Sequence, residues 1–470
     1  MSQYLVCDLD ECLIKTDALY EQWIVLLKKN PLLFLLSFFW ILKGRAFFKH
    51  QISKHTSFNA AILPYRDEVI AYIKDYRSSG KGSVILASAS PLAWVQAVSN
   101  HLGIFDQVIG SNEIHNLKSD KKLQALQEKI GTASFSYIGD HFADLPLWKQ
   151  SEEVIAVNPN KPLEIKIRKL GKPVIVIKDL SHPWKLLIKQ IRPHQWVKNA
   201  LVFLPALAGH KLFQDQYFLK CSLAFVSFSL AASFVYVLND ILDLSSDRNH
   251  HTKRKRPFAS GNLPIRWGLF LLPILLLGSL AFATTLPMQF AGWIATYLIL
   301  NLGYSFYLKQ SVIVDIIILS LMYTMRIFAG SAASSVPVSE WLLSFSTLFF
   351  FSLACVKRYT EISRSKNKIT LDGRGYRQVD HSMVQSLGVG SGLLSILIIL
   401  LYLQGAEVRA LYSNPQGLWY ATPILLFWIS RIWLLTNRDE IHDDPVVFAV
   451  KDKVSWACLI LLAIVSAVSL

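Results

Sequence analysis

Cysteine is scarce in this chain, and its spacing excludes the sites that cysteine pairs commonly build. The 470 residues include five, with no CxxC pair and no metal-ligand spacing: Cys7, Cys12, Cys221, Cys355 and Cys458. Neither a structural zinc site nor a disulfide framework is therefore expected, and we expect Cys7 and Cys12 to be packing residues. We also expect no cleavable signal peptide, because the N-terminus opens directly into a strand-like run, Tyr4–Asp8.

Charged residues are sparse over long stretches of the second half of the chain. Residues 1–185 mix charged, polar and apolar types as a soluble domain does, whereas the chain from Trp196 onward is mostly apolar blocks separated by short polar loops. About 20 apolar residues cross a bilayer core as a helix. We count nine such blocks: 196–211, 219–241, 266–285, 288–307, 312–332, 341–357, 386–405, 417–435 and 454–470. The sequence predicts a soluble domain followed by an all-α bundle of nine transmembrane helices.

Basic residues outnumber acidic ones, 48 to 33, and they are divided unevenly between the loops. If residues 1–185 are cytoplasmic, the loops on that side carry Arg248, Lys253, Arg254, Lys255, Arg256, Lys309, Lys357, Arg358, Arg364, Lys366, Lys368, Arg374, Arg377, Arg438, Lys451 and Lys453. The opposite loops show little beyond Lys211, Lys220 and Arg409. This asymmetry follows the positive-inside rule and puts the C-terminus on the far side. It predicts a multi-pass protein of a bacterial-type inner membrane and argues against nucleic-acid binding.

Acidic residues follow the strand-like runs of the soluble half. Asp8 and Asp10 end the first run, and Asp140 ends a later one, Phe135–Asp140, with Asp144 four residues on. A further run, Ser83–Ser88, lies between two helical segments, at 67–78 and 91–102. Alternating strands and helices predict an α/β domain with a parallel sheet, in which ligands bind at the carboxyl ends of the strands.

These motifs resemble the haloacid dehalogenase superfamily of phosphatases over residues 3–160. The resemblance implies that Asp8 is a nucleophile that forms a phospho-aspartate and that Asp10 is the general acid/base. It also implies that Ser88 and Lys118 hold the phosphoryl oxygens, and that Asp140 and Asp144 bind Mg²⁺ together with Asp8. Many members have Gly-Thr after the second Asp, where this chain has Glu11-Cys12. A degenerate domain kept for structure or regulation is the alternative.

An insertion at about 17–63 separates the first two of these motifs and is expected to form a helical cap. It contains an apolar run, Pro31–Leu42, followed by Lys43, Arg45 and Lys49. The run is too short to span a bilayer. It is either a buried cap helix or a segment in the membrane interface with lysines at the headgroups, and its apolar character all round favours the interface.

Three carboxylates end the second apolar block. Asp240, Asp243 and Asp247 are spaced i, i+3, i+7, which puts them on one face of a continuous helix. Like charges stacked in this way require a cation, and carboxylates that bridge to substrate phosphates suit Mg²⁺. A cluster of this kind at membrane depth indicates function. The basic stretch that follows, with Lys253 and Arg256, can hold further phosphate charge, although membrane topology accounts for part of it.

Other polar residues gather at the cytoplasmic ends of later blocks. Tyr304 and Lys309 close the fourth block, Asp315 opens the fifth, and Arg326 lies within the fifth. Lys357, Arg358 and Glu361 follow the sixth. A buried arginine in a helical bundle requires an anionic partner. The polar segment 372–377 is either a lid or a solvated loop.

This half resembles the UbiA superfamily of intramembrane polyprenyl transferases, with Asn239-Asp240-x-x-Asp243-x-x-x-Asp247 as the first signature. A closer resemblance is to polyprenyl-phosphate phosphoribosyltransferases. It is carried by Arg192–Asn199, which includes Lys198, by Tyr304-Ser-x-x-Leu-Lys309 before a single Asp315, and by Arg326-x-x-Ala-Gly330. Aromatic prenyl transferases of the superfamily usually carry a second DxxxD motif, and this chain has only Asp315 there.

The sequence thus predicts three segments: a phosphatase-like domain at 1–180, a linker or interfacial helix at 181–195 and a transferase domain at 196–470. The resemblance implies transfer of phosphoribose from phosphoribosyl diphosphate to a polyprenyl phosphate, after which the soluble domain removes the 5-phosphate, with Mg²⁺ in both domains. The residues expected to contact substrate are Lys198, Asn199, Asn239, Tyr304, Asp315, Lys357, Arg358 and Glu361, and those expected to hold phosphate in this half are Lys253, Arg256, Lys309 and Arg326. One alternative is an aromatic polyprenyltransferase that takes a prenyl diphosphate. Another is a transporter or scaffold that carries a phosphatase.

Overall fold

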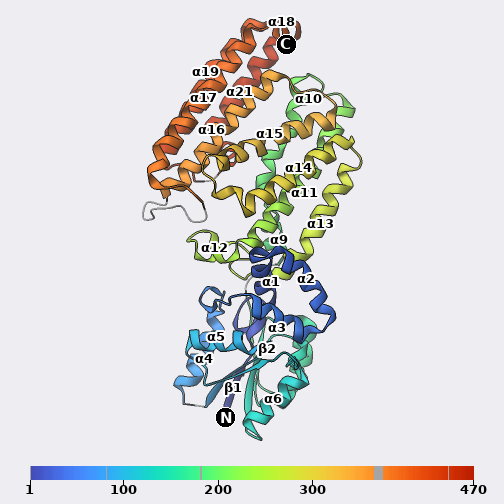
Figure 1. Cartoon of the computed structure of the whole chain (residues 1–470), viewed down its shortest axis with the longest axis vertical. Helices are drawn as coiled ribbons and strands as arrows, with labels where there is room; N and C mark the ends of the chain where they lie inside the picture. Colours follow the sequence, from blue (N-terminus) through green and yellow to red (C-terminus); the bar gives the residue numbers. More distant parts are fainter. Residues whose placement is uncertain (1, 81, 180–182, 365–373, 443) are drawn as a thin grey trace. The chain divides into compact units, whose positions relative to one another are not determined.

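The computed structural model describes residues 2–80, 82–179, 183–364, 374–442 and 444–470 (Figure 1). Lys366, Lys368 and the start of the 372–377 segment lie outside these ranges. The chain divides into two compact units: the first comprises Met1–Gln190 and Val237–Leu272, and the second comprises Ile191–Tyr236 and Pro273–Leu470.

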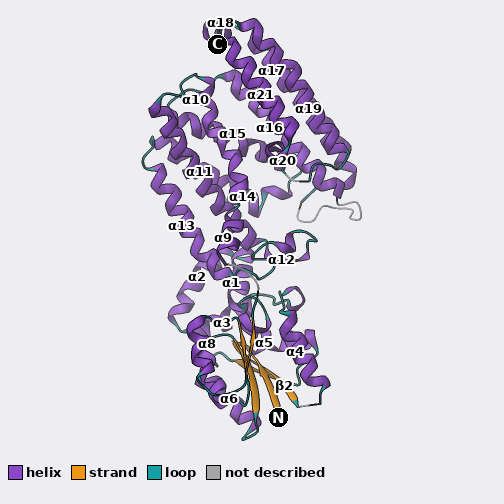
Figure 2. Cartoon of the chain, turned by 180° about the vertical axis from the view of Figure 1, so that it is seen from behind, coloured by secondary structure: helices purple, strands orange, loops and turns teal. Residues whose placement is uncertain are grey.

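The first unit is built on a six-stranded parallel sheet flanked by helices (Figure 2). The strands lie in the order β3-β2-β1-β4-β5-β6. They are β1 (Tyr4–Cys7), β2 (Ser83–Pro91), β3 (Gln107–Ser111), β4 (Phe135–Gly139), β5 (Val154–Val157) and β6 (Val174–Ile177). Cys7 in the central strand pairs with Leu86 of β2 and Ile138 of β4, so the acids that follow β1 and β4 meet at one edge. The predicted parallel sheet is confirmed, whereas β5 and β6 were not foreseen.

Helices and short turns complete this unit. They are η1 (Leu9–Leu13), α1 (Ala18–Lys29), α2 (Pro31–Leu42), α3 (Arg45–His55), η2 (Ala60–Ile62), α4 (Asp67–Ser78), α5 (Leu92–Leu102), α6 (Asp120–Ile130), η3 (Phe142–Asp144), α7 (Leu145–Gln150), α8 (Lys161–Arg168), α9 (Pro183–Ile191), α12 (Leu244–Asn249) and η5 (Lys253–Lys255). The α1–α3 group is the predicted insertion between β1 and β2. Its inner side packs on the buried core that includes Leu13, Leu26 and Ile52.

The second unit is helical. It contains η4 (Pro193–Phe203), α10 (Leu204–Ala208), α14 (Met288–Phe306), η6 (Leu308–Gln310), α15 (Val314–Ser334), α16 (Glu340–Arg364), η7 (Gln378–Asp380), α17 (His381–Gln404), α18 (Ala406–Leu411), η8 (Pro415–Tyr420), α19 (Ala421–Asn437), α20 (Pro445–Lys451) and α21 (Lys453–Ser469). The boundary between the units falls inside α11 (Asp215–Leu242) and α13 (Ile265–Ala283).

Helix α15 is the centre of the second unit, since most of its residues are buried. It contributes to two hydrophobic clusters, one with α16, α17 and α19 and the other with α11 and α14. A Cβ on Gly330 would lie 2.0 Å from the Val202 carbonyl oxygen, so glycine permits η4 to pack directly on α15. That close approach brings the polar residues of η4 to those of α15.

Six helices in the described ranges are long and apolar enough to cross a membrane. They are Gln216–Leu242, Ile265–Ala283, Val314–Ser334, Glu340–Arg364, Gln378–Gln404 and Pro415–Asn437. The three other expected spans correspond to η4 with α10, to α14 and to α21, a shorter apolar helix. Several apolar helices fit a multi-pass membrane protein, and the count of nine stays a prediction.

Candidate functional site

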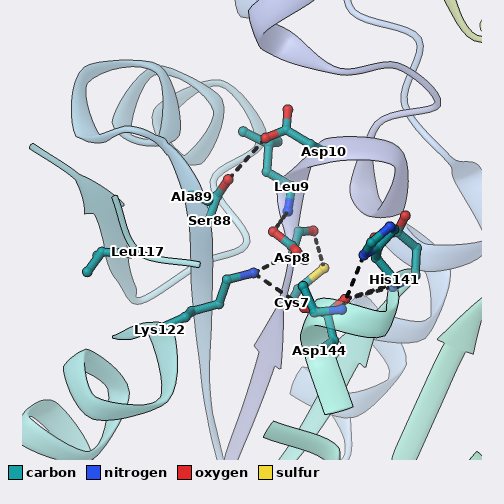
Figure 3. Close-up of polar contacts among 12 residues, drawn as sticks. Cys7, Asp8, Leu9, Asp10, Ser88, Ala89, Leu117, Lys122, His141 and Asp144 are labelled. Carbon is teal, nitrogen blue, oxygen red and sulfur yellow. Dashed lines mark hydrogen bonds and ion pairs between the residues drawn. The ribbon is translucent and has the colours of Figure 1, made fainter. Parts of the chain in front are cut away.

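Asp8 lies just beyond β1, where its carboxylate meets a buried lysine (Figure 3). The Oδ2 atom accepts a hydrogen bond from Lys122 Nζ at 2.6 Å, and Oδ1 accepts one from the Leu9 amide at 2.8 Å. Burial raises the pKa of Asp8 to about 6, against the attraction of Lys122. A carboxylate that is desolvated and oriented in this way can attack an electrophilic phosphorus.

Two more carboxylates join Asp8 after β4. Asp8, Asp140 and Asp144 offer oxygen atoms that lie within 4.8 Å of one another. Asp144 Oδ2 accepts hydrogen bonds from the amides of Asp140 at 3.2 Å and His141 at 3.1 Å. A Cβ on Gly139 would lie 2.7 Å from this oxygen, so glycine allows the carboxylate to fold back against the strand.

This group of carboxylates carries more negative charge than its surroundings neutralise. Burial, followed by repulsion from Asp144 and Asp8, raises the pKa of Asp140 well above its usual range. Three carboxylates that converge in a buried pocket are the ligands that Mg²⁺ prefers. The donor set therefore fits a divalent cation.

The ammonium group at Asp8 belongs to Lys122, which is 3% exposed. Besides Asp8, its Nζ contacts the Tyr137 hydroxyl at 3.0 Å and Asp144 Oδ1 at 3.6 Å. Burial would lower the pKa of Lys122, but Asp8 and Asp144 outweigh that effect and raise it. Lys118, predicted to hold phosphate, lines the same pocket. The sequence did not single out Lys122 as the lysine of the site, because Lys118 and Lys121 lie within four residues of it.

Asp10 and Ser88 also meet at this edge of the sheet. Asp10 Oδ2 accepts hydrogen bonds from the Ser88 hydroxyl at 3.2 Å and from the Ser90 hydroxyl at 2.7 Å. Its Oδ1 accepts one from the Ala18 amide, at the start of the cap, at 2.8 Å. Asp10 therefore links strand β2 to the first cap helix.

A cavity of about 490 Å³ opens beside these residues. Its floor is acidic, with Asp8, Asp140 and Asp144, and the cap supplies Tyr20, Trp23, Ile41, Arg45, Phe48 and Lys49 to its wall. Arg266 also lines it, from the first turn of α13. The cap thus encloses a site of the size that small ligands need.

The second set of acids lies where α11 ends. Asp240 is in the last turn of α11, Asp243 is the N-cap of α12, and Asp247 is inside α12. The helix is therefore interrupted at Asp243, so the three acids do not lie on one face of a continuous helix as predicted. They pair with two different cations. Arg256 Nη1 contacts Asp240 Oδ1 at 3.0 Å and Asp247 Oδ2 at 2.6 Å, so two of the acids converge on one guanidinium.

The third acid meets the cap of the soluble part. Lys28 Nζ, from α1, lies 3.4 Å from Asp243 Oδ1 and 3.3 Å from the Leu242 carbonyl oxygen. Arg248 makes a two-pronged pair with Glu21 of the same helix, at 2.5 and 3.0 Å, and both side chains are buried. Sequence reasoning missed these contacts, which join residues more than 200 positions apart. Of the other residues expected here, Asn239 is in α11 and Lys253 begins η5.

Asp315 is fully buried in the second unit and is surrounded by donors. Its carboxylate contacts Arg358 Nε at 2.6 Å, Arg374 Nη1 at 3.1 Å and the Tyr304 hydroxyl at 2.7 Å. Both arginines also pair with Glu361. The structure thus brings together four predicted site residues, Tyr304, Asp315, Arg358 and Glu361, and adds Arg374, whose place in a polar loop did not predict this contact. Lys309 lies nearby in sequence, in η6.

A second polar group in this unit centres on Asp444, the N-cap of α20. Lys198 Nζ lies 2.6 Å from Asp444 Oδ2, and Lys357 Nζ lies 3.6 Å from it. The Tyr323 hydroxyl donates to Asp444 at 2.9 Å. Asp444 was missed, because an Asp before Pro445 reads as a helix cap.

Arg326 obtains its partner from η4. Its Nε donates to Asn199 Oδ1 at 2.8 Å, and its guanidinium lies over the Phe228 and Tyr297 rings at 5.0 and 5.3 Å. Among the described residues, the buried charge is therefore stabilised by an amide, the Met322 carbonyl oxygen and aromatic faces, whereas the expected partner was an anion. Asn199 and Arg326, both predicted site residues, are direct neighbours.

Comparison with known proteins gives a family match for the membrane part. Residues 200–459 match the model of the UbiA prenyltransferase family. An uncharacterized protein of Sinorhizobium fredii is 38% identical over 456 residues, which cover 96% of this chain and 88% of that protein. The decaprenyl-phosphate phosphoribosyltransferase of Mycobacterium tuberculosis is 34% identical over 278 residues, covering 57% of this chain and 88% of that enzyme. A UbiA homolog from Archaeoglobus fulgidus, solved with DMAPP and Mg²⁺, has a TM-score of 0.47 and 14% identity over 60% of this chain and 99% of its own.

Proposed function

Because the chain belongs to the UbiA prenyltransferase family, we propose that its embedded part transfers phosphoribose from phosphoribosyl diphosphate to a polyprenyl phosphate. The similarity to a decaprenyl-phosphate phosphoribosyltransferase supports phosphoribose as the transferred group and a polyprenyl phosphate as the acceptor. In the reaction a phosphate oxygen of the lipid forms a bond to C1 of the ribose, and the bond from C1 to the diphosphate breaks. The lipid phosphate is already anionic, so no strong general base is required.

The acids of α11 and α12 are the proposed metal ligands for this reaction. Asp240 and Asp247 converge on one cationic group, Arg256, and Asp243 is the third carboxylate of the series. Bound Mg²⁺ would neutralise the departing diphosphate and stabilise the charge that develops on it. Lys253 and Arg256 supply further positive charge for phosphate oxygens. Lys309 and Arg326 are the proposed phosphate-binding residues of the second unit.

The observation that carries this choice of substrate is the environment of Asp315. Two guanidinium groups pair with its carboxylate, and a tyrosine hydroxyl donates a hydrogen bond to it. A carboxylate neutralised in this way is a poor candidate for a second metal-binding motif, which aromatic prenyl transferases of the superfamily usually carry. Arg374, whose side chain is 19% exposed, instead suits an anionic acceptor.

The test uses membranes that contain the full chain, radiolabelled phosphoribosyl diphosphate and a polyprenyl phosphate. We expect a lipid-linked ribose from the parent and none from Asp243→Ala. Incubation with a prenyl diphosphate and 4-hydroxybenzoate tests the aromatic alternative. A prenylated aromatic product, with no lipid-linked ribose, would replace the proposal by that alternative.

We further propose that the soluble part is a haloacid dehalogenase-like phosphatase that removes the 5-phosphate of the lipid-linked product. Asp8 attacks the phosphorus, the bond to the sugar oxygen breaks, and Asp10 donates a proton to that oxygen. Water then hydrolyses the phospho-aspartate and releases inorganic phosphate. Lys122 is positioned to neutralise the approaching phosphoryl group, and Asp8, Asp140 and Asp144 would hold Mg²⁺. Release of phosphate from ribose 5-phosphate by the parent, and its loss in Asp8→Asn, tests this step.

The segment boundaries and membrane placement follow from the same proposal. Residues 1–180 form the phosphatase domain, 181–195 the linker and 196–470 the transferase domain. A bacterial inner membrane, with the soluble domain in the cytoplasm, would give both sites access to the same lipid. Protease protection of a C-terminal tag in right-side-out and inverted vesicles would test the opposite placement of the C-terminus.

A further inference from the structure

Helix α2 presents an entirely apolar outer face. Leu32, Leu35, Leu36, Phe39 and Leu42 follow the spacing of one helical face and are 75, 60, 54, 65 and 83% exposed. The inner side, with Leu33, Phe34 and Trp40, packs on the core of the cap. Ser37 is buried, and its hydroxyl bonds to Trp23 and to the Phe34 carbonyl oxygen. The outer face named here therefore consists of apolar side chains, which can enter lipid without losing hydrogen bonds to water.

The surroundings of α2 indicate which partner covers this face. Lys29 precedes the helix and Lys43 follows it, and both are exposed, as expected for a helix flanked by anionic headgroups. Its unit also contains the ends of two candidate membrane spans, α11 and α13. The first turn of α13 lies beside the cap, because its Arg266 pairs with Glu11 and lines the same cavity as Ile41 of α2. The face therefore lies at the level where a membrane span begins.

We propose that α2 lies in the membrane interface with its outer face among the lipid acyl chains, so that the Asp8 cavity opens at the bilayer surface. Ile41 connects the two features, because it is partly exposed on α2 and also lines the cavity. A lipid-linked substrate could then reach Asp8 without leaving the membrane.

The test places a fluorescent probe on α2 in the full chain. All five native cysteines are buried, so a cysteine introduced by Leu35→Cys can be labelled selectively with an NBD dye. Lys74→Cys on α4 is the matched control, since Lys74 is exposed and α4 lies away from α2 in both views. The protein is reconstituted in vesicles of phosphatidylethanolamine and phosphatidylglycerol that contain an acyl-chain spin label.

We expect the probe at position 35 to be quenched by the spin-labelled lipid at least about threefold more than the probe at position 74. Equal quenching at the two positions would overturn the proposal. Shielding of position 35 that depends on protein density and yields crosslinks between copies would also overturn it, in favour of a dimer contact. The readout needs no enzymatic activity, so its outcome is separate from that of the proposed function.

A different observation, the cations on the cavity wall, carries a second inference. Arg266 Nη1 pairs with Glu11 Oε2 at 2.9 Å, and the arginine side chain is 52% exposed. A guanidinium has five N–H donors, so this pair leaves most of its hydrogen-bonding capacity for a ligand. Arg45, from the first turn of α3, lines the same cavity. Glu11 stands where many related phosphatases have Gly, and here it orients a residue of a membrane span.

We infer that Arg45 and Arg266 form a subsite for a second phosphate, at the mouth of the cavity whose floor holds Asp8. The ligand class is a sugar that carries two phosphate groups, one at each end. This inference rests on the proposed function, whose lipid-linked substrate has a 5-phosphate for Asp8 and a phosphodiester at C1 for the arginines. The diester would lie on the lipid side, near the start of α13.

The test measures binding, so that it does not depend on hydrolysis. Ribose 1,5-bisphosphate and ribose 5-phosphate are titrated into the full chain carrying Asp8→Asn and Asp243→Ala, which disable both reaction centres. We expect the bisphosphate to bind about tenfold more tightly and Arg266→Gln to abolish that advantage. Lys74→Gln is the control cation and should preserve it.

Two results would overturn the subsite. One is equal affinity for the two sugars in the parent background, and the other is an advantage that survives both Arg266→Gln and Arg45→Gln. Failure of the phosphatase proposal has a different signature, since the chain would then release no phosphate from ribose 5-phosphate while the binding difference persisted.

Discussion

The two acidic groups of the first unit hold their carboxylates in opposite ways. Asp8, Asp140 and Asp144 come from the ends of two adjacent strands, and their oxygens converge within 4.8 Å beside a single lysine. Asp240, Asp243 and Asp247 come from one segment, and each is paired with a cation, Arg256 or Lys28. The strand group has one paired cation for its three acids, whereas the helix group has two.

The difference follows from backbone geometry. Adjacent parallel strands bring their carboxyl ends to the same edge, which forces carboxylates together, and burial then disfavours their ionised forms. A helix interrupted at Asp243 instead spreads its acids over two directions, where flexible cations can reach them. We infer that a divalent cation completes the strand group, whereas in the helix group it must compete with Arg256 and Lys28.

The largest expected effect is the loss of both activities when Mg²⁺ is removed, and it tests the contrast between the two acidic groups. Chelation should stop both transfer and hydrolysis, by at least about 100-fold each, because metal charge stabilisation is worth several kcal/mol. On readdition, hydrolysis should recover at a lower Mg²⁺ concentration than transfer, since one cation, Lys122, contacts the strand group, whereas Arg256 and Lys28 both pair with the helix group. Product formation over a Mg²⁺ titration measures both. Recovery of the two activities at the same concentration would contradict the contrast.

Lys122 and Lys118 can be separated by substitution. Lys122→Met should lower phosphate release from ribose 5-phosphate by about 100- to 1000-fold, because a desolvated charge that faces the reacting group is worth several kcal/mol. Transfer of phosphoribose should be unchanged. Lys118→Met is the matched variant. We expect it to lower phosphate release less, because Lys118 lines the cavity wall, whereas Lys122 contacts Asp8. A larger loss in Lys118→Met would return the phosphate-binding role to that residue.

Asp315 extends the contrast to the second unit, where an acid is fully neutralised. Arg358→Met should destabilise the protein by about 3–5 kcal/mol, because it leaves a buried carboxylate with less compensation. Arg431 is the control, since its pair with Asp452 at 2.6 Å is partly exposed, and Arg431→Met should cost about 1 kcal/mol or less. Thermal unfolding in detergent compares the two. Equal losses would show that burial does not decide the strength of these pairs.

The smallest expected effect concerns Asp17, on the wall of the Asp8 cavity. Burial, with repulsion from Asp10, raises the pKa of Asp17 to about 7. Its folded pKa exceeds the unfolded value, so the stability it contributes is present below about pH 4 and is lost as the pH rises to about 7. Asp17→Asn should flatten this part of the stability profile, because an amide does not titrate in this range. Asp67→Asn is an exposed control, and profiles that coincide for parent and Asp17→Asn would contradict the assignment.

Local sequence patterns predicted the strands and helices that hold the site. They predicted the contacts between its side chains less well. The runs ending at Asp8, Ser88 and Asp140 are strands, because continuous apolar segments with acidic ends have few other ways to pack. The expected 67–78 helix is α4, with the same bounds. The sheet then brings these side chains together without further information.

Contacts between distant parts of the chain could not be predicted in this way. Lys122 faces Asp8 only because α6 begins at Asp120 and turns its third residue inward. Lys28 and Asp243, or Lys198 and Asp444, are paired across more than 200 residues by tertiary packing. The i, i+3, i+7 spacing could not predict the interruption of the helix at Asp243 either, because a shared face is expected only if the helix continues.

The order of the two proposed reactions is tested most directly by a double label. Phosphoribosyl diphosphate carries ³H in the ribose and ³²P in the 5-phosphate, and the lipid product is isolated from membranes containing the parent or Asp8→Asn. We predict ³H without ³²P in the parent lipid, and both labels in the Asp8→Asn lipid. The same ratio of labels in the two lipids would contradict the account.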